Sequence, residues 1–199
     1  MQHSLRHEQV QDEGRPAEAM RIVVIGTPGA GKTTLAREIA RQLQLEHIEL
    51  DAINWQPGWR DLTRHNPSEF VRRVTKAIQS PAWVIDGNYS PVRDAIWRQA
   101  THLIWLDYER RVIMRRVIRR SLLRALLQTE LWAGNRERWR HFVRPSHPIR
   151  WAWSTWQQRR EETAQRLQAA EYAHLVVLRL RNPGQASQVI RQLMELSRR

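Results

Sequence analysis

The chain has 199 residues, enough for one α/β domain with a full hydrophobic core. It contains no cysteine, which excludes disulfide bonds, thiolate metal sites and a cysteine nucleophile. The net charge of +13 has two explanations that the composition does not separate. One is non-specific affinity for nucleic acid, and the other is a general preference for arginine added to the needs of a phosphoryl-transfer site.

Residues 1–19 are polar and have no hydrophobic periodicity, so we expect a disordered N-terminal extension. Residues 20–199 are expected to form a single domain. No apolar run approaches the roughly 20 residues of a membrane span, and the first residues lack the apolar segment of a signal peptide. We therefore expect a cytoplasmic protein, either a monomer or a homodimer.

A phosphate-binding motif begins this domain. Residues 21–25 predict a buried strand, and Leu35, Ile39 and Leu43 predict one face of a helix. Between them the sequence fits the pattern G-x-x-x-x-G-K-[ST], which predicts a nucleoside-triphosphate site in this context. Backbone N–H groups would bind phosphate, the lysine would reach the terminal phosphates, and the threonine hydroxyl would bind Mg²⁺. The expected nucleotide-binding residues are Gly26, Thr27, Pro28, Gly29, Ala30, Gly31, Lys32, Thr33 and Thr34.

The rest of the chain alternates between strand and helix patterns. Strands are predicted at residues 47–50, 83–86, 102–106 and 175–178, and helices at 68–79, 93–99, 109–127, 132–141, 146–169 and 186–196. This alternation predicts an α/β fold with a parallel sheet and helices on both faces. Because the carboxyl ends of parallel strands share one edge, Gly26, Asp51, Asp86 and Asp107 are expected to face one crevice.

The acidic strand ends suggest different roles. Asp86 is expected to hold Mg²⁺ together with Thr33, and Asp51 is expected to orient or deprotonate the hydroxyl of a phosphoryl acceptor. Asp107 precedes a predicted helix and is expected to cap it.

Two further features have alternative interpretations. Arg116 and Arg120 are one helical turn apart and could clamp a transferred phosphoryl group, or they could belong to a solvated basic face with the other arginines of that helix. Trp55 and Trp59 could form an aromatic wall for the acceptor, or they could cover the edge of the sheet.

The chain resembles the adenylate-kinase-like P-loop kinases and, more closely, the DNA topology modulation proteins. The matching segments are GTPGAGKTTLA (26–36), LDAINWQPGW (50–59), WVIDGNYSPVRD (83–94), IWLD (104–107), RRVIRR (115–120) and LWAGNRE (131–137). The resemblance implies a five-stranded parallel sheet in the order 2-3-1-4-5, with mobile acceptor-binding and lid segments. The lid would lie at about residues 121–170.

The resemblance also implies roles for single residues. Arg116 and Arg120 match kinase arginines that stack on the adenine and contact phosphates, and Asn182 and Pro183 match the loop that meets the adenine. Lid arginines are expected among Arg136, Arg138, Arg140 and Arg144. The acceptor motif departs from the Phe-Pro-Arg that follows Asp-Gly in nucleotide kinases, which puts a nucleoside-monophosphate acceptor in doubt. The expected acceptor-binding residues are Asp51, Trp55, Trp59, Asp86, Gly87, Asn88, Tyr89 and Arg93.

Taken together, the sequence predicts an ATP- and Mg²⁺-dependent phosphotransferase of the nucleotide-kinase type, with a small-molecule acceptor that the sequence does not name. The expected catalytic residues are Lys32, Asp51, Arg116 and Arg120. The alternative is a nucleotide-binding regulatory protein that acts on DNA through its basic surface.

Overall fold

The computed structural model describes residues 20–127, 129–136 and 148–198, and the predicted N-terminal extension lies outside these ranges. Five parallel strands form the central sheet: β1 (Arg21–Gly26), β2 (Glu46–Glu49), β5 (Trp83–Asp86), β6 (His102–Leu106) and β7 (Val176–Leu180). Their order is β2-β5-β1-β6-β7. Numbered along the chain, these five strands lie in the order 2-3-1-4-5, so the predicted fold is confirmed.

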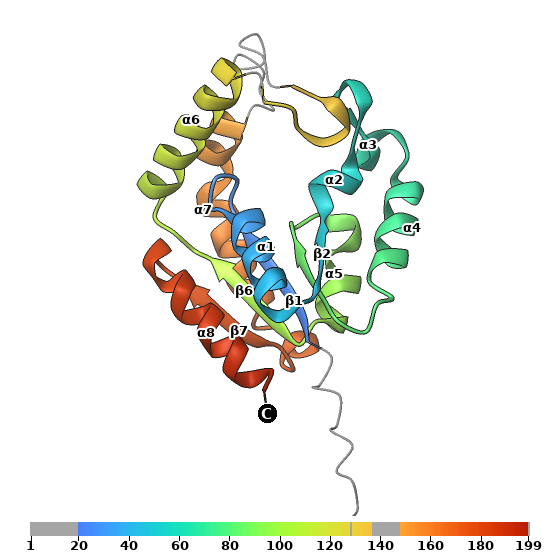
Figure 1. The fold of residues 1–199 in the computed structure, drawn as a ribbon, viewed down its shortest axis with the longest axis vertical. Coiled ribbons are helices and arrows are strands. Elements are labelled where there is room, and N and C mark those ends of the chain that lie inside the picture. The colour runs from blue at the N-terminus through green and yellow to red at the C-terminus, as the bar shows by residue number, and fades with distance from the viewer. Residues whose placement is uncertain (1–19, 128, 137–147, 199) are drawn as a thin grey trace, which may run out of the picture.

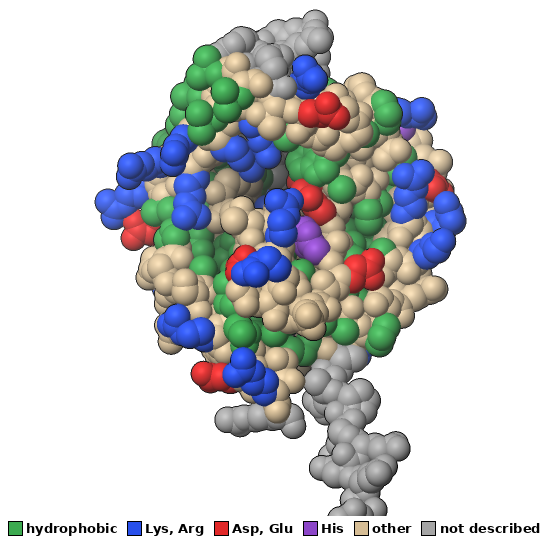
Figure 2. All heavy atoms as spheres, in the orientation of Figure 1, with side chains coloured by type: hydrophobic (Ala, Val, Ile, Leu, Met, Phe, Trp, Pro, Cys, Tyr) green, Lys and Arg blue, Asp and Glu red, His purple; other side chains and the backbone are tan. Residues whose placement is uncertain are grey.

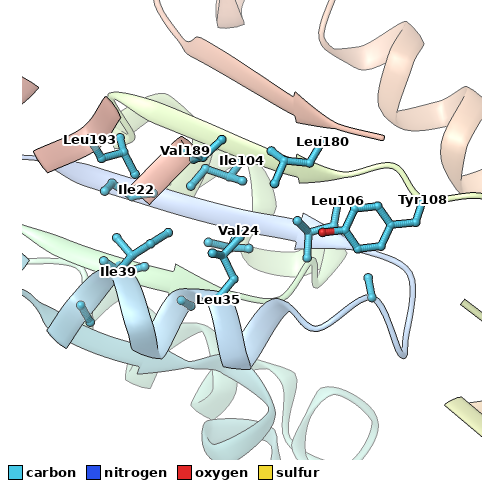
Figure 3. Close-up of a cluster of buried hydrophobic side chains, with 14 of the residues drawn as sticks. Ile22, Val24, Leu35, Ile39, Ile104, Leu106, Tyr108, Leu180, Val189 and Leu193 are labelled. Carbon is cyan, nitrogen blue, oxygen red and sulfur yellow. The ribbon is translucent and has the colours of Figure 1, made fainter. Parts of the chain in front are cut away.

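Helices cover both faces of the sheet (Figure 1). Side chains of β1 alternate between the two faces, with Ile22 and Val24 in one buried cluster and Val23 and Ile25 in the other. The first cluster includes residues of α1 (Lys32–Leu43), α6 (Arg110–Leu127) and α8 (Ala186–Leu196). Figure 3 shows side chains of α1 and α8 against those of the strands. The second includes residues of α4 (Pro67–Ala77) and α5 (Ser90–Gln99). The helix α7 (Pro148–Arg166) packs beside α6.

The structure differs from the sequence-based prediction after β2. The strand ends at Glu49, and α2 (Leu50–Asn54) begins at once, so Asp51 lies in the first turn of a short helix. The sequence patterns predict no strand or helix at residues 52–67. The structure has a small hairpin there, formed by β3 (Trp55–Gln56) and β4 (Arg60–Asp61), joined by η1 (Pro57–Trp59) and followed by α3 (Leu62–His65).

The helix predicted at residues 132–141 is wrong in its described part. Only the 3-10 turn η2 (Trp132–Gly134) forms there, and Ala133 and Gly134 have φ values of 54° and 74°, which an α-helix does not allow. Glu130 and Arg136 then pair in an isolated antiparallel bridge. Residues 137–147 lie outside the description.

The last strand also extends further than predicted, to Leu180, and it is followed by the 3-10 turn η5 (Pro183–Gln185). Within the described ranges, no helix is both long enough and apolar enough to cross a membrane.

Candidate nucleotide and acceptor site

The glycine-rich loop joins β1 to α1 at the carboxyl edge of the sheet. Helix α6 lies directly against it, because a Cβ atom on Gly29 would be 2.9 Å from the Cβ of Val117. Gly29 has a φ of 87°, so this position combines left-handed backbone with close packing, and both favour glycine. The N-terminus of α1 follows the loop and has no acidic residue in its first turn. Its unpaired N–H groups and helix dipole therefore suit a bound anion.

Lys32 lies among charges of both signs. Burial lowers its pKa, the carboxylates of Asp51 and Asp86 raise it, and the guanidinium groups of Arg120 and Arg159 lower it again. The loop lysine is therefore close to both predicted carboxylates and to two further cations. A bound polyphosphate would offset this concentration of positive charge.

Asp86 is the last residue of β5 and is 3% exposed. The Thr33 hydroxyl donates a hydrogen bond of 2.6 Å to Asp86 Oδ2, and His47 Nε2 lies 2.9 Å from Asp86 Oδ1. The first contact brings together the two residues predicted to hold Mg²⁺. Sequence reasoning missed His47, which was assigned only to a strand.

The donors at this position are oxygen atoms, as Mg²⁺ prefers. Among the residues that the structure describes, no group of three or more His, Asp or Glu side chains is arranged to hold a metal. This does not conflict with Mg²⁺, which is commonly bound through one or two protein ligands while substrate phosphates and water complete its coordination. The hydroxyl of Thr33 and the carboxylate of Asp86 therefore fit that ion.

Asp51, in α2, lies near Lys32, because its charge raises the pKa of that lysine. The Tyr89 hydroxyl donates a hydrogen bond of 2.6 Å to Asp51 Oδ1, and burial together with the charge of Asp51 raises the pKa of Tyr89. The phenol therefore stays protonated and orients the carboxylate. Gly87 permits the approach of these two segments, since its φ is 126° and an added Cβ would lie 2.9 Å from the Cβ of Leu50.

The tryptophan hairpin contacts the chain that follows α6. Trp55 and Trp59 meet edge to face, with ring centroids 5.5 Å apart. Asn135 is 4% exposed; its Oδ1 accepts the Trp59 backbone N–H at 2.8 Å, and its Nδ2 donates to the Gln56 carbonyl at 2.9 Å. We call this contact between residues 55–61 and 130–136 the clasp. In Figure 1, the segment after α6 crosses to the side of α2 and α3.

A second bond lies beside the clasp. The Trp132 indole N–H donates to Glu49 Oε1 at 2.8 Å, and Glu49 is the last residue of β2. Burial raises the pKa of Glu49, and the hydrogen bond from Trp132 partly opposes that effect. Sequence reasoning singled out Trp55 and Trp59 but missed the hairpin that carries them. It also missed the partners of the hairpin, because these are distant in the sequence.

The α6 arginines predicted for the site point to the loop. The Arg116 guanidinium donates to the Ala30 carbonyl at 2.9 Å and lies 5.5 Å from the centre of the Tyr108 ring. Arg120 is near enough to Lys32 to lower its pKa. Both arginines predicted on α6 therefore lie beside the phosphate loop.

Two further arginines, on α5 and α7, lie among or near the predicted acceptor-binding residues. Arg93, on α5, is partly buried, with its Nε 3.7 Å from Asp94 Oδ1. Arg159, on α7, lines a small cleft with Gly26, Thr27 and Asn88. Burial lowers the pKa of Arg159 and neighbouring Arg93 lowers it further, while the carboxylate of Glu162 opposes the shift.

Sequence reasoning placed the lid arginines earlier in the chain than Arg159. Of those predicted, Arg136 is exposed, with its Nη2 3.7 Å from Glu130 Oε2, and Arg138, Arg140 and Arg144 lie outside the described residues.

The predicted adenine loop makes its described contacts within itself. Asn182 and Gln185 form a reciprocal capping box, and Pro183 begins the turn. The structure thus places both residues after β7 without linking them to the phosphate loop.

Asp107 is not a helix cap, so that prediction is wrong. Helix α6 begins three residues later, at Arg110, and the Asp107 carboxylate is buried. Arg160 Nε lies 2.8 Å from its Oδ1, and Arg179 Nε donates to its Oδ2 at 2.9 Å. Asp107 therefore ties α7 and β7 to the end of β6.

Comparison with known proteins agrees with this architecture. Residues 22–86 match the family described as "ATPase family associated with various cellular activities (AAA)". The matched residues include the strand, the glycine-rich loop and the helix around Lys32. No curated protein matches the sequence significantly.

Several solved kinases share the fold. A shikimate kinase from Bacteroides thetaiotaomicron is 16% identical with a TM-score of 0.53, covering 89% of this chain and 97% of that one. A gluconokinase from Sinorhizobium meliloti is 17% identical with a TM-score of 0.50, covering 92% and 93%. A shikimate kinase from Aquifex aeolicus is 13% identical with a TM-score of 0.50, covering 88% and 94%. At these identities the likeness establishes the fold alone.

Proposed function

We propose that this protein is an ATP-dependent phosphotransferase that transfers the γ-phosphoryl group to a hydroxyl of a small acceptor. The observation that carries this proposal is the position of Lys32 between two carboxylates with different partners. Asp86 meets the Thr33 hydroxyl at 2.6 Å, and Asp51 meets the Tyr89 hydroxyl at 2.6 Å. A carboxylate held in place beside the phosphate loop can orient an acceptor hydroxyl and accept its proton.

In this reaction the residues of the site would have different roles. The loop 26–33 binds the ATP phosphates, and Lys32 stabilises the charge that develops on the transferred group. Thr33 and Asp86 would hold Mg²⁺, which neutralises phosphate charge when it is bound. Asp51 orients the acceptor hydroxyl and accepts its proton.

Arginines complete the electrostatic part of the proposal. Arg116 and Arg120 of α6 lie on the nucleotide side, while Arg93 and Arg159 lie on the acceptor side. Guanidinium groups on both sides would stabilise charge spread over the phosphoryl oxygens. The printed names of the similar structures, shikimate kinase and gluconokinase, support a small-molecule acceptor.

The test is the release of ADP from Mg-ATP with a panel of nucleoside monophosphates, nucleosides and small hydroxylated metabolites. We expect ADP release that depends on one acceptor class and is lost in the variant Asp51→Asn. The matched control is Asp61→Asn, which changes a carboxylate in the hairpin that accepts hydrogen bonds from the backbone N–H and the hydroxyl of Thr63. ATP binding without acceptor-dependent turnover in the wild type would contradict the proposal.

A second candidate, a nucleotide-binding protein that acts on DNA, is favoured by the basic face of α6. Figure 2 shows basic side chains on the α6 side of the molecule, and the exposed arginines of this helix are Arg110, Arg111, Arg115, Arg116 and Arg119. This hypothesis predicts a DNA affinity that falls steeply with salt concentration and changes when ATP is bound. A gel-shift titration across salt, with and without Mg-ATP, would test it; binding indifferent to nucleotide would contradict a regulatory role.

A further inference from the structure

The Asp86 carboxylate uses its two oxygen atoms for different partners. Oδ2 accepts the Thr33 hydroxyl at 2.6 Å, and Oδ1 meets His47 Nε2 at 2.9 Å. The His47 side chain is 17% exposed and that of Asp86 is 4% exposed, so water has little access to this contact. His47 therefore holds Oδ1 of Asp86, while Oδ2 meets Thr33.

The sheet itself sets the position of His47. Strand β2 pairs in parallel with β5, with Glu49 opposite Asp86 and His47 opposite Val84. The imidazole comes from the neighbouring strand and meets a carboxylate at the end of β5. Neither residue lies on a loop, so the contact is built on two hydrogen-bonded strands, which hold such geometry better than loops do.

A carboxylate at the end of a short side chain can rotate about its last bond and exchange its two oxygens. A hydrogen bond to one oxygen restricts that rotation and leaves the other oxygen in a defined direction. Outer partners of metal-binding carboxylates act in this way, and their loss commonly weakens metal affinity about 10–100-fold. The direction fixed here is toward the Thr33 hydroxyl.

We propose that His47 is a positioning residue that holds Asp86 in the orientation needed for Mg²⁺ at Thr33. This inference rests on the proposed function, because it assumes that the phosphate loop takes Mg-ATP. It gives His47 a role that the motifs of the chain do not indicate. The imidazole touches neither nucleotide nor metal; it acts through Asp86.

The experiment compares ATP binding by calorimetry with Mg²⁺ and with EDTA in the wild type, His47→Leu and His47→Gln. In His47→Leu we expect the gain in ATP affinity that Mg²⁺ produces to fall by up to about 10–100-fold, the usual loss of metal affinity when such a partner is removed. The ATP affinity of this variant in EDTA should change less than about twofold. His47→Gln should restore most of the Mg²⁺ effect, because its amide can still donate to Oδ1. If His47→Leu does not fold, His47→Asn, whose amide is too short to reach Oδ1, takes its place with the same expectation.

A matched control is His102→Leu, which removes a partly buried histidine from strand β6. His102 Nδ1 contacts the Thr101 hydroxyl at 2.8 Å, at the start of the strand rather than at its carboxyl end. We expect this variant to bind Mg-ATP as the wild type does. Thermal unfolding of all variants separates a loss of fold from a loss of metal binding.

Two outcomes contradict different parts of the account. If the wild type binds ATP more tightly with Mg²⁺ and His47→Leu keeps that difference, or loses affinity equally in Mg²⁺ and in EDTA, the positioning role is wrong. If the wild type itself binds no ATP, or binds it equally with and without Mg²⁺, the proposed function is wrong.

Discussion

Asp86 ends β5 and Asp107 directly follows β6, the two strands that flank β1, yet the surroundings of the two aspartates differ. Both are buried at the carboxyl edge of the sheet, 3% and 6% exposed. Two guanidinium groups hold Asp107, from Arg160 and Arg179. Among the residues that the structure describes, the side chains that Asp86 meets at hydrogen-bond distance are a hydroxyl and an imidazole. The same edge of one sheet thus holds a carboxylate neutralised within the fold and another that is suited to a metal ion.

The difference shows why the position of a carboxylate does not by itself define a site. Parallel strands bring their carboxyl ends to one edge, so both aspartates had to lie there. Their partners come from other elements: Arg160 from α7, Arg179 from β7 and His47 from β2. Burying a carboxylate requires compensation, and the identity of the compensating groups separates a structural ion pair from a candidate metal ligand.

The largest effect on turnover should come from Lys32, which lies near Asp86 at the proposed Mg-ATP site. Lys32→Met keeps the apolar length of the side chain and removes its charge. We expect acceptor-dependent turnover to fall about 10²–10³-fold, the size typical of a lost electrostatic contact in a transition state. Because burial lowers the pKa of Lys32, the charged form is disfavoured in the fold, and the variant should not unfold at a lower temperature.

Normal turnover in Lys32→Met would show that the lysine of the phosphate loop does not take part in the reaction. The exposed Lys76, on α4, gives the control variant Lys76→Met, for which we expect wild-type kinetics. Steady-state ADP release and differential scanning calorimetry on the same samples provide both readouts.

Asp107→Asn should destabilise the fold without changing the affinity for the nucleotide. We expect the free energy of unfolding to fall by about 2–3 kcal/mol, because two charge-assisted contacts are lost in a buried place. Urea denaturation measures this change. An unchanged midpoint would mean that the two arginines do not stabilise the junction of α7 and β7.

The clasp predicts a smaller and more local effect. Asn135→Ala removes the acceptor of the Trp59 N–H and the donor to Gln56, so about 1–2 kcal/mol of local stability should be lost. Hydrogen exchange should report faster opening in residues 55–61 and little change in β1. Uniform acceleration across the sheet would show that the clasp is part of the global core.

The smallest effect is expected for Tyr89→Phe. This variant removes one hydrogen bond to Asp51, worth about 1 kcal/mol, and leaves the carboxylate in place. We expect acceptor-dependent turnover to fall by less than about tenfold with ATP affinity unchanged. Equal loss of ATP affinity would place Tyr89 on the nucleotide side of the crevice.

How much the sequence predicts depends on the distance between interacting residues. The strand, glycine loop and helix around Lys32 are contiguous, so the motif and its periodicity predict both the local structure and the sheet edge that carries the site. Residues 52–67 contain helical turns and a hairpin too short for a periodic pattern to appear. The prediction of a helix beginning at residue 132 is wrong because Ala133 and Gly134 have left-handed backbone conformations. They lie in a turn that packs on the hairpin.

The partners of the site residues follow from tertiary packing. His47 and Asp86 are 39 residues apart, and Trp59 and Asn135 are 76 apart. Nothing in a local pattern links such pairs. For Asp107, the expected cap was the usual role of an aspartate before a helix, and packing with Arg160 and Arg179 overrode that local preference.

We propose that Asp86 belongs to a Mg-ATP site and that Asp107 does not. The most direct test is calorimetric titration of ATP, with Mg²⁺ and with EDTA, into the wild type, Asp86→Asn and Asp107→Asn at a temperature where all three are folded. We predict that Mg²⁺ tightens ATP binding in the wild type and in Asp107→Asn, and that Asp86→Asn loses this gain. An Asp86→Asn protein that keeps the full effect of Mg²⁺, or an Asp107→Asn protein that loses it, would contradict the account.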